Sequence, residues 1–111
     1  MITANDIIQK LKEGKLDSPG ELSDYLVKLS AYLFDAAEYE TEAEIEYMKK
    51  WAEIKANEHT DKLTDALTKQ TEEYRLYKKM KNSKDSITEV IRALKHKLKN
   101  LQTELSEFQN Y

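Results

Sequence analysis

Residues 87–108, ITEVIRALKHKLKNLQTELSEF, decide the fold of this chain. Their large apolar side chains follow one another at alternating steps of four and three residues: Ile87, Ile91, Leu94, Leu98, Leu101, Leu105 and Phe108. This spacing is typical of a helix that buries one stripe against a partner helix, as in a coiled coil. We therefore expect a long helix here, with Leu94, Leu98 and Leu101 buried.

The same register continues towards the N-terminus. It passes through Lys84, Met80 and Tyr77 and reaches Ala66 and Leu63 without a phase change. The continuity predicts one helix over about residues 61–109, in which Leu63 and Ala66 face the partner helix.

Two capping signals define the helices that come earlier in the chain. Thr3 and Asp6 form a plausible capping pair, and Gly14 is suited to end a short helix over about residues 4–13. Ser18-Pro19-Gly20-Glu21 predicts the start of a second helix near residue 19. No Gly or Pro follows Gly20, so we expect this helix to run to about residue 57. Residues 38–47 alternate polar and apolar side chains, but no second strand is at hand to pair with them, which favours a helix there.

Composition and charge place a hinge between the two long helices. The stretch Asn57–Asp61 is short and polar, and Thr60 or Asp61 can cap a new helix. Residues 1–74 carry nine basic and seventeen acidic side chains, whereas residues 75–111 carry nine basic and four acidic ones. A fold near residue 60 sets the acidic block beside the basic one. The sequence therefore predicts a single all-α domain over 1–111, namely a long, coiled-coil-like antiparallel hairpin of helices 19–57 and 61–109 with a short N-terminal helix.

The composition of the 111 residues excludes several classes of protein. There is no Cys for disulfides or thiolate metal sites, and two Gly and one Pro are too few for the turns of a β-sandwich or barrel. No apolar run approaches the ~18 residues of a membrane span, and residues 1–10 do not resemble a secretory signal. We expect a cytoplasmic protein without membrane contact.

Catalytic and metal-binding patterns are weak. His59 and His96 lack an evident carboxylate partner on their own helix face, and Ala occupies positions 56 and 93, where a Glu-x-x-His metal motif needs Glu. Glu38, Glu42 and Glu46 are best interpreted as a solvated or Lys-paired acidic face. We expect no enzymatic activity, no metal and no cofactor.

A set of apolar and aromatic residues adjoins the main stripes and forms a candidate protein interface: Tyr25, Tyr32, Tyr39, Leu67 and Tyr74. Tyr is enriched in interfaces, and a two-helix hairpin has a small core. The hypothesis is self-association, or binding of a different protein.

The alternative hypothesis is nucleic-acid binding through the basic third helix, with these candidate contacts: Lys78, Lys79, Lys81, Lys84, Arg92, Lys95 and Lys99. Such side chains can follow a phosphate backbone, and Tyr74 and Tyr77 could stack on bases. The overall pI of about 5.5 is far below that of most such domains.

The chain also resembles small helical proteins from the early recombination and replication regions of bacteriophages and prophages. The resemblance rests on Ser18-Pro19-Gly20-Glu21-Leu22, on residues 47–53 (YMKKWAE) and on residues 91–104 (IRALKHKLKNLQTE), and it covers about residues 18–108. It implies a cytoplasmic phage accessory protein that acts by contact with a host or phage protein, in DNA metabolism or against a host defence system. It assigns no functional residue.

Overall fold

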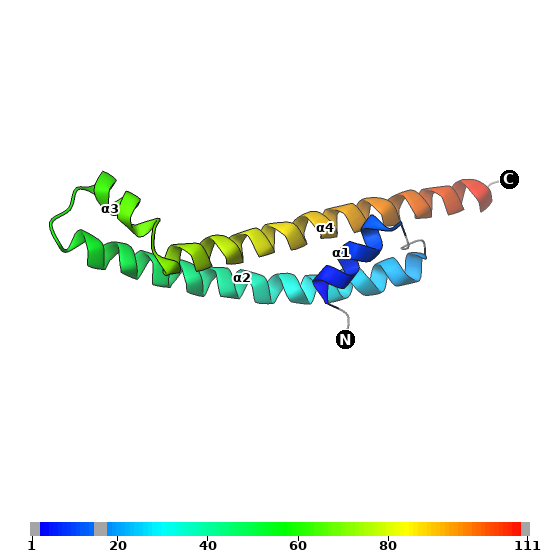
Figure 1. The fold of residues 1–111 in the computed structure, drawn as a ribbon. Helices are drawn as coiled ribbons and strands as arrows, with labels where there is room; N and C mark the ends of the chain where they lie inside the picture. Colours follow the sequence, from blue (N-terminus) through cyan, green and yellow to red (C-terminus); the bar gives the residue numbers. More distant parts are fainter. Residues whose placement is uncertain (1–2, 15–17, 110–111) are drawn as a thin grey trace. The chain divides into compact units, whose positions relative to one another are not determined.

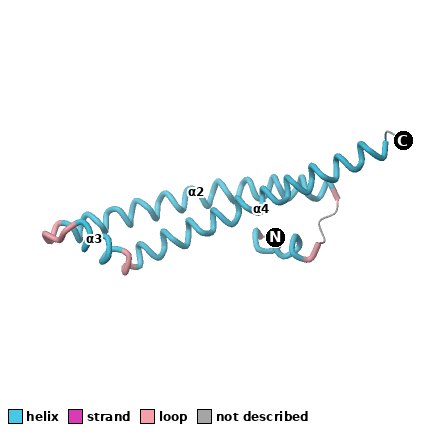
Figure 2. The backbone as a smooth tube through the Cα atoms, turned by 90° about the horizontal axis from the view of Figure 1, so that it is seen from above, coloured by secondary structure: helices cyan, strands magenta, loops and turns pink. Residues whose placement is uncertain are grey.

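The computed structural model describes residues 3–14 and 18–109, with side chains up to Leu105. It contains four helices, α1 (Ala4–Lys12), α2 (Pro19–Lys55), α3 (Asp61–Thr68) and α4 (Glu72–Gln109) (Figure 1). Helices joined by loops account for all the described regular structure, and no strand occurs in it (Figure 2). The all-α prediction is confirmed, and the strand-like residues 38–47 lie inside α2.

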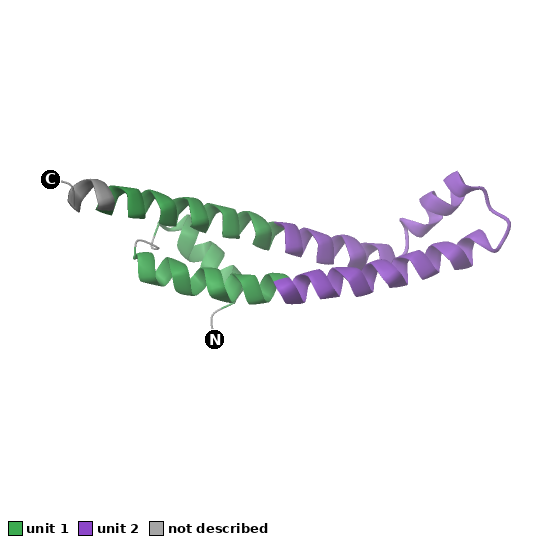
Figure 3. Ribbon diagram, turned by 180° about the vertical axis from the view of Figure 1, so that it is seen from behind, with its two compact units in different colours: residues 1–33, 86–111 green, residues 34–85 purple. Residues whose placement is uncertain are grey.

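The chain divides into two compact units, each of which pairs a part of α2 with a part of α4 (Figure 3). Unit 1 comprises residues 1–33 and 86–111, and unit 2 comprises residues 34–85. The predicted helical hairpin is thus confirmed, because the long helices pack against each other.

Unit 1 has an aliphatic core supplied by three helices. Its buried apolar side chains are Ile7, Leu22, Tyr25, Leu29, Ile87, Ile91 and Leu94. Complete burial of one large aliphatic side chain stabilises a fold by about 1.5–3 kcal/mol relative to its exposure. Leu98 and Leu101 are half-buried, so they are less buried than their place in the heptad pattern predicted. The side chain of Phe108 lies outside the described part of the structure.

Helix α1 is held by a capping box and by polar contacts with α2. The Thr3 backbone N–H donates to Asp6 Oδ2 (3.0 Å), and the Asp6 N–H donates to Thr3 Oγ1 (3.2 Å). The hydrogen bond from the Thr3 N–H to the carboxylate lowers the pKa of the Asp6 carboxyl, because it favours the charged form. Lys10 Nζ donates to the Tyr25 hydroxyl (2.6 Å) and lies 3.8 Å from Glu21 Oε1. The short N-terminal helix is therefore confirmed, ending one residue earlier than expected.

Unit 2 has a core of small side chains. Its described buried residues are Ala36, Ala43, Thr64 and Thr68. The threonine hydroxyls donate to carbonyls of their own helix, Thr64 Oγ1 to Thr60 O (2.8 Å) and Thr68 Oγ1 to Thr64 O (2.6 Å). Their hydrogen bonds are thus satisfied without leaving α3, so both side chains can be buried at little cost.

The loop after α2 lies where the hinge was expected. Thr60 caps α3 by accepting the Leu63 N–H (3.2 Å). Lys55 spans the turn, since its Nζ donates to the His59 carbonyl (2.9 Å) and lies 2.6 Å from Asp61 Oδ1. Glu58 has a φ of 63°, a left-handed conformation that suits glycine better than glutamate.

The prediction of one continuous helix over 61–109 is wrong, because residues 69–71 interrupt the helix between α3 and α4. Thr71 accepts the Tyr74 N–H (3.3 Å) and donates to the Thr68 carbonyl (2.6 Å), so it starts a new helix in the manner of a cap. The register is interrupted there, which leaves Leu63 and Ala66 exposed while Thr64 and Thr68 face the core.

Candidate functional site

The described structure offers no arrangement suited to metal chemistry. No group of three or more His, Asp or Glu residues is close enough to hold a metal ion in the part of the chain that the structure describes. Exposed His96 and half-buried His59 lie on different units. None of the described helices combines the length and the apolar character that crossing a bilayer requires.

The most distinctive surface is a second apolar face of α2 in unit 2. We call it the outer stripe, and its residues follow steps of three or four: Phe34, Ala37, Thr41, Ile45, Met48 and Ala52. Three of the large side chains are more than half exposed, Phe34 by 65%, Ile45 by 51% and Met48 by 52%. At 3.6 residues per turn, this stripe lies roughly opposite the buried residues Ala36 and Ala43.

Two shallow hollows follow one another along the outer stripe. One hollow is bordered by Phe34, Ala37, Glu38, Thr41 and Glu42, and a second by Thr41, Glu44, Ile45, Met48, Lys49 and Ala52. Groups of residues at positions i, i+3, i+4 and i+7 form the holes of coiled-coil packing. Thr41 Oγ1 donates to the Ala37 carbonyl (3.0 Å), so its polar atom is already satisfied within the helix.

An acidic ridge runs along one border of the outer stripe, formed by Glu38, Glu42 and Glu46. All three residues are exposed. Glu46 meets Lys49 at 3.3 Å, a solvent-exposed pair of small energetic value. Glu38 and Glu42 therefore place negative charge beside the first hollow of the stripe, whereas Lys49 offsets Glu46 beside the second.

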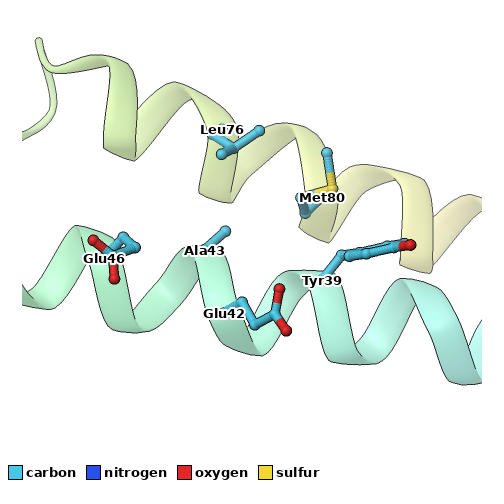
Figure 4. A pocket seen from close by; sticks show the side chains of 6 residues that line it. All are labelled: Tyr39, Glu42, Ala43, Glu46, Leu76 and Met80. Atoms are coloured by element: carbon cyan, nitrogen blue, oxygen red, sulfur yellow. The ribbon is translucent and has the colours of Figure 1, made fainter.

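A separate hollow of about 430 Å³ lies on the other side of the acidic ridge, between α2 and α4 (Figure 4). Ala43 points towards α4, and Leu76 and Met80 lie on the facing stretch of α4. The small side chain at position 43 leaves this space open, with Leu76 49% exposed and Tyr39 58% exposed at its edge. Glu42 borders both this hollow and the outer stripe.

Three tyrosines pack together in unit 2. The Tyr47 ring is stacked on Tyr77, with centroids 5.4 Å apart and an interplanar angle of 7°, and is tilted against Tyr74 at 5.3 Å. Burial raises the pKa of the Tyr47 hydroxyl, and nearby Asp65 adds to the effect. Tyr74 and Tyr77 thus have aromatic partners inside the chain.

The predicted interface residues are divided between the two units and differ in burial. Tyr25 is buried in unit 1, where its ring also lies below Lys10 Nζ at 5.1 Å from the centroid. Tyr32, Leu67 and Tyr74 are half-buried, and Tyr39 is exposed at the edge of the hollow. The role of these residues in binding a partner stays a prediction.

The basic candidates are divided between the two units. Lys78, Lys79, Lys81 and Lys84 belong to unit 2, whereas Arg92, Lys95 and Lys99 belong to unit 1. Lys84 forms an ion pair with Glu40, which links the acidic and basic blocks as expected and raises the pKa of the Lys84 ammonium. One guanidinium nitrogen of Arg92 lies 2.6 Å from Glu89 Oε1. Lys78 and Lys79 are exposed.

Sequence reasoning missed Phe34, Ile45 and Met48. Their signal is the seven-residue step from Phe34 to Thr41 to Met48, with Ile45 between. The comparisons with known proteins add nothing to it, since no family model, no curated protein and no solved structure matches this chain.

Proposed function

We propose that this is a non-enzymatic interaction protein that binds another protein through the exposed apolar surface of unit 2. The observation that supports the proposal is the outer stripe, where α2 carries a second row of large apolar side chains opposite the buried one. Apolar side chains that gather on one exposed face are typical of interaction sites. In line with the resemblance to phage early-region proteins, the partner would be a host or phage protein in the cytoplasm.

The test compares partner capture by the wild-type chain and by a variant of the outer stripe. The double variant Ile45→Gln/Met48→Gln removes two exposed apolar side chains and keeps the helix, because Gln is a good helix former. The matched control is Leu105→Gln, which alters a side chain of equal exposure (52%) in unit 1. Each immobilised protein is exposed to nuclease-treated bacterial lysate.

The proposal expects the wild type and the Leu105→Gln control to retain the same partner, and the double variant to lose it. Circular dichroism of all three proteins checks that the helices are unchanged. Undiminished capture by Ile45→Gln/Met48→Gln would show that the partner binds to a different surface.

Nucleic-acid binding is the second candidate, favoured by the exposed Lys78 and Lys79 on α4. Tyr77 is stacked on Tyr47 and Tyr74 is tilted against it, and these contacts argue against the use of either ring as a platform for bases. In a gel-shift experiment, this candidate expects Lys78→Gln/Lys79→Gln to weaken binding and to reduce its salt dependence. Lys12→Gln/Lys62→Gln changes the same number of charges at other exposed positions and is the control.

A further inference from the structure

The occupant of the outer stripe can be inferred from the side chains that border it. We propose that it is one amphipathic helix of another protein, with apolar side chains at coiled-coil spacing and Lys or Arg on the side that meets the acidic ridge. This inference rests on the proposed function and specifies its partner.

A helix fits this surface because the stripe is straight and narrow. From Phe34 to Ala52 it follows a single helix for about 27 Å at the usual rise of 1.5 Å per residue. Its two hollows succeed one another along α2, so a facing helix can place successive side chains in them. Helices docked in apolar grooves contribute side chains at the same spacing of three and four residues.

The charges that border the stripe select a basic partner. Glu38 and Glu42 border the first hollow, and Glu44 borders the second on the other side of the stripe. Lys49, which also borders the second hollow, is the basic exception. Residues next to a coiled-coil seam determine partner choice through charge, so Lys or Arg opposite Glu38 and Glu42 is favoured.

The same charges disfavour a second copy of this chain. Antiparallel pairing of two outer stripes about their midpoint at position 43 would set the same flank of each copy together. Glu42 would then lie next to Glu42 of the other copy, and Glu44 next to Glu44, while Glu38 would approach Lys49. Parallel pairing in register would set opposite flanks together, so that Glu42 of each copy would lie next to Glu44 of the other. Like charges at such positions oppose pairing, so both orientations of a self-complex carry repulsion that a basic helix would not.

The test uses two synthetic helical peptides of 21 residues as probes. Both have Ile and Leu at the seam positions, and they differ in carrying Lys or Glu at every flanking position. Fluorescence anisotropy measures the binding of each peptide to the full-length chain at low salt. The proposal expects the Lys peptide to bind at least tenfold more tightly than the Glu peptide.

Three variants locate the binding. Glu38→Gln/Glu42→Gln should reduce the preference for the Lys peptide at least threefold, whereas the control Glu89→Gln/Glu104→Gln, which removes two exposed charges in unit 1, should leave it unchanged. Ile45→Gln/Met48→Gln should abolish binding of the Lys peptide. Equal binding of both peptides, or a preference that survives Glu38→Gln/Glu42→Gln, would overturn the proposal.

Sedimentation of the chain alone tests the competing occupant. A dimer that Ile45→Gln/Met48→Gln converts to a monomer would identify a second copy on the stripe and overturn the inference. A lysate partner lost in that variant, together with no preference for the Lys peptide, would overturn the basic chemistry and leave the proposed function intact. Failure of both tests would overturn both proposals.

Discussion

Units 1 and 2 are built from the same two long helices, but they bury different kinds of side chain. Unit 1 places Leu22, Leu29 and Leu94 in its core with no exposed fraction. Unit 2 has only Ala and Thr among its described buried residues, and large apolar side chains such as Phe34 and Met48 remain at its surface. Unit 1 also exposes Val27 (73%) and Leu105 (52%), so the two units differ chiefly in what they bury, large aliphatic side chains in unit 1 and small ones in unit 2.

This difference connects sequence to function through packing. The aliphatic core of unit 1 stabilises the fold by removing large side chains from water. In unit 2 the exposed apolar side chains contribute little to the stability of the isolated chain, so their energetic value would be realised on binding. The following experiments test this division.

The largest expected effect is on the cores themselves. Leu94→Ala in unit 1 should lower the free energy of unfolding by about 2–5 kcal/mol, because it leaves a cavity at a fully buried site. Met48→Ala in unit 2 should change it by less than about 0.5 kcal/mol, because the side chain is 52% exposed. Chemical denaturation followed by circular dichroism measures both values. Similar losses from the two variants would contradict the contrast between the units.

The next experiment compares how each unit holds its short helix. In unit 1, Ile7 of α1 is fully buried, and Ile7→Ala should cost about 2–5 kcal/mol. In unit 2, half-buried Trp51 of α2 donates from Nε1 to Asp65 Oδ1 of α3 at 2.7 Å. Trp51→Phe, which removes this hydrogen bond, should cost about 1 kcal/mol.

Hydrogen exchange can assign these losses to the elements concerned. Ile7→Ala should accelerate exchange in α1, and Trp51→Phe should accelerate it in α3. If Trp51→Phe costs as much as Ile7→Ala, then α3 is held more by apolar packing than by the polar contact, and the distinction between the units is weaker than we infer.

The sequence pattern predicted the helix that α4 forms but placed its start too early, and the reason is physical. The apolar side chains from Ile87 to Leu94 lie on one face of the helix, and their spacing correctly predicted that this face is buried. The heptad spacing carries no information on side-chain to backbone hydrogen bonds. At the break, Thr71 donates to the Thr68 carbonyl at the end of α3 and accepts the Tyr74 N–H at the start of α4. The acidic pair Glu72 and Glu73 after Thr71 was the available signal for a helix start.

The outer stripe was missed for a different reason. A helix with two opposed apolar stripes has a weak overall periodicity, because each stripe cancels the other. Ala36 and Ala43 mark the inner face with small side chains, while Phe34 and Ile45 mark the outer one with larger ones. Only the packing in the structure distinguishes the buried row from the exposed row.

A smaller effect is expected at the turns. Unit 1 uses Gly14 at φ 69°, whereas unit 2 uses Glu58 at φ 63°. Gly14→Ala should destabilise the chain by about 1 kcal/mol, because a side chain is strained in this conformation. Glu58→Gly should relieve the same strain. The greater entropy of glycine in the unfolded state offsets part of this gain, so the net stabilisation should be about 0.5 kcal/mol. Thermal unfolding checks both signs, and a destabilising Glu58→Gly would show that the carboxylate makes a compensating contact.

The smallest effect is a pH dependence from the tyrosine cluster of unit 2. Burial holds the pKa of Tyr47 above its ordinary value of 10.0, so between these two values the unfolded chain has lost a proton that the folded chain retains. The contribution of Tyr47 to stability is therefore constant below pH 10 and falls as pH rises above it. Tyr47→Phe cannot titrate, so its free energy of unfolding should fall less steeply above pH 10 than that of the wild type. Denaturation at a series of alkaline pH values, with ultraviolet absorbance to follow phenol ionisation, measures the difference. Equal slopes for the two proteins would mean that Tyr47 is solvated in solution, and the stacking with Tyr77 would then no longer be a feature that separates unit 2 from unit 1.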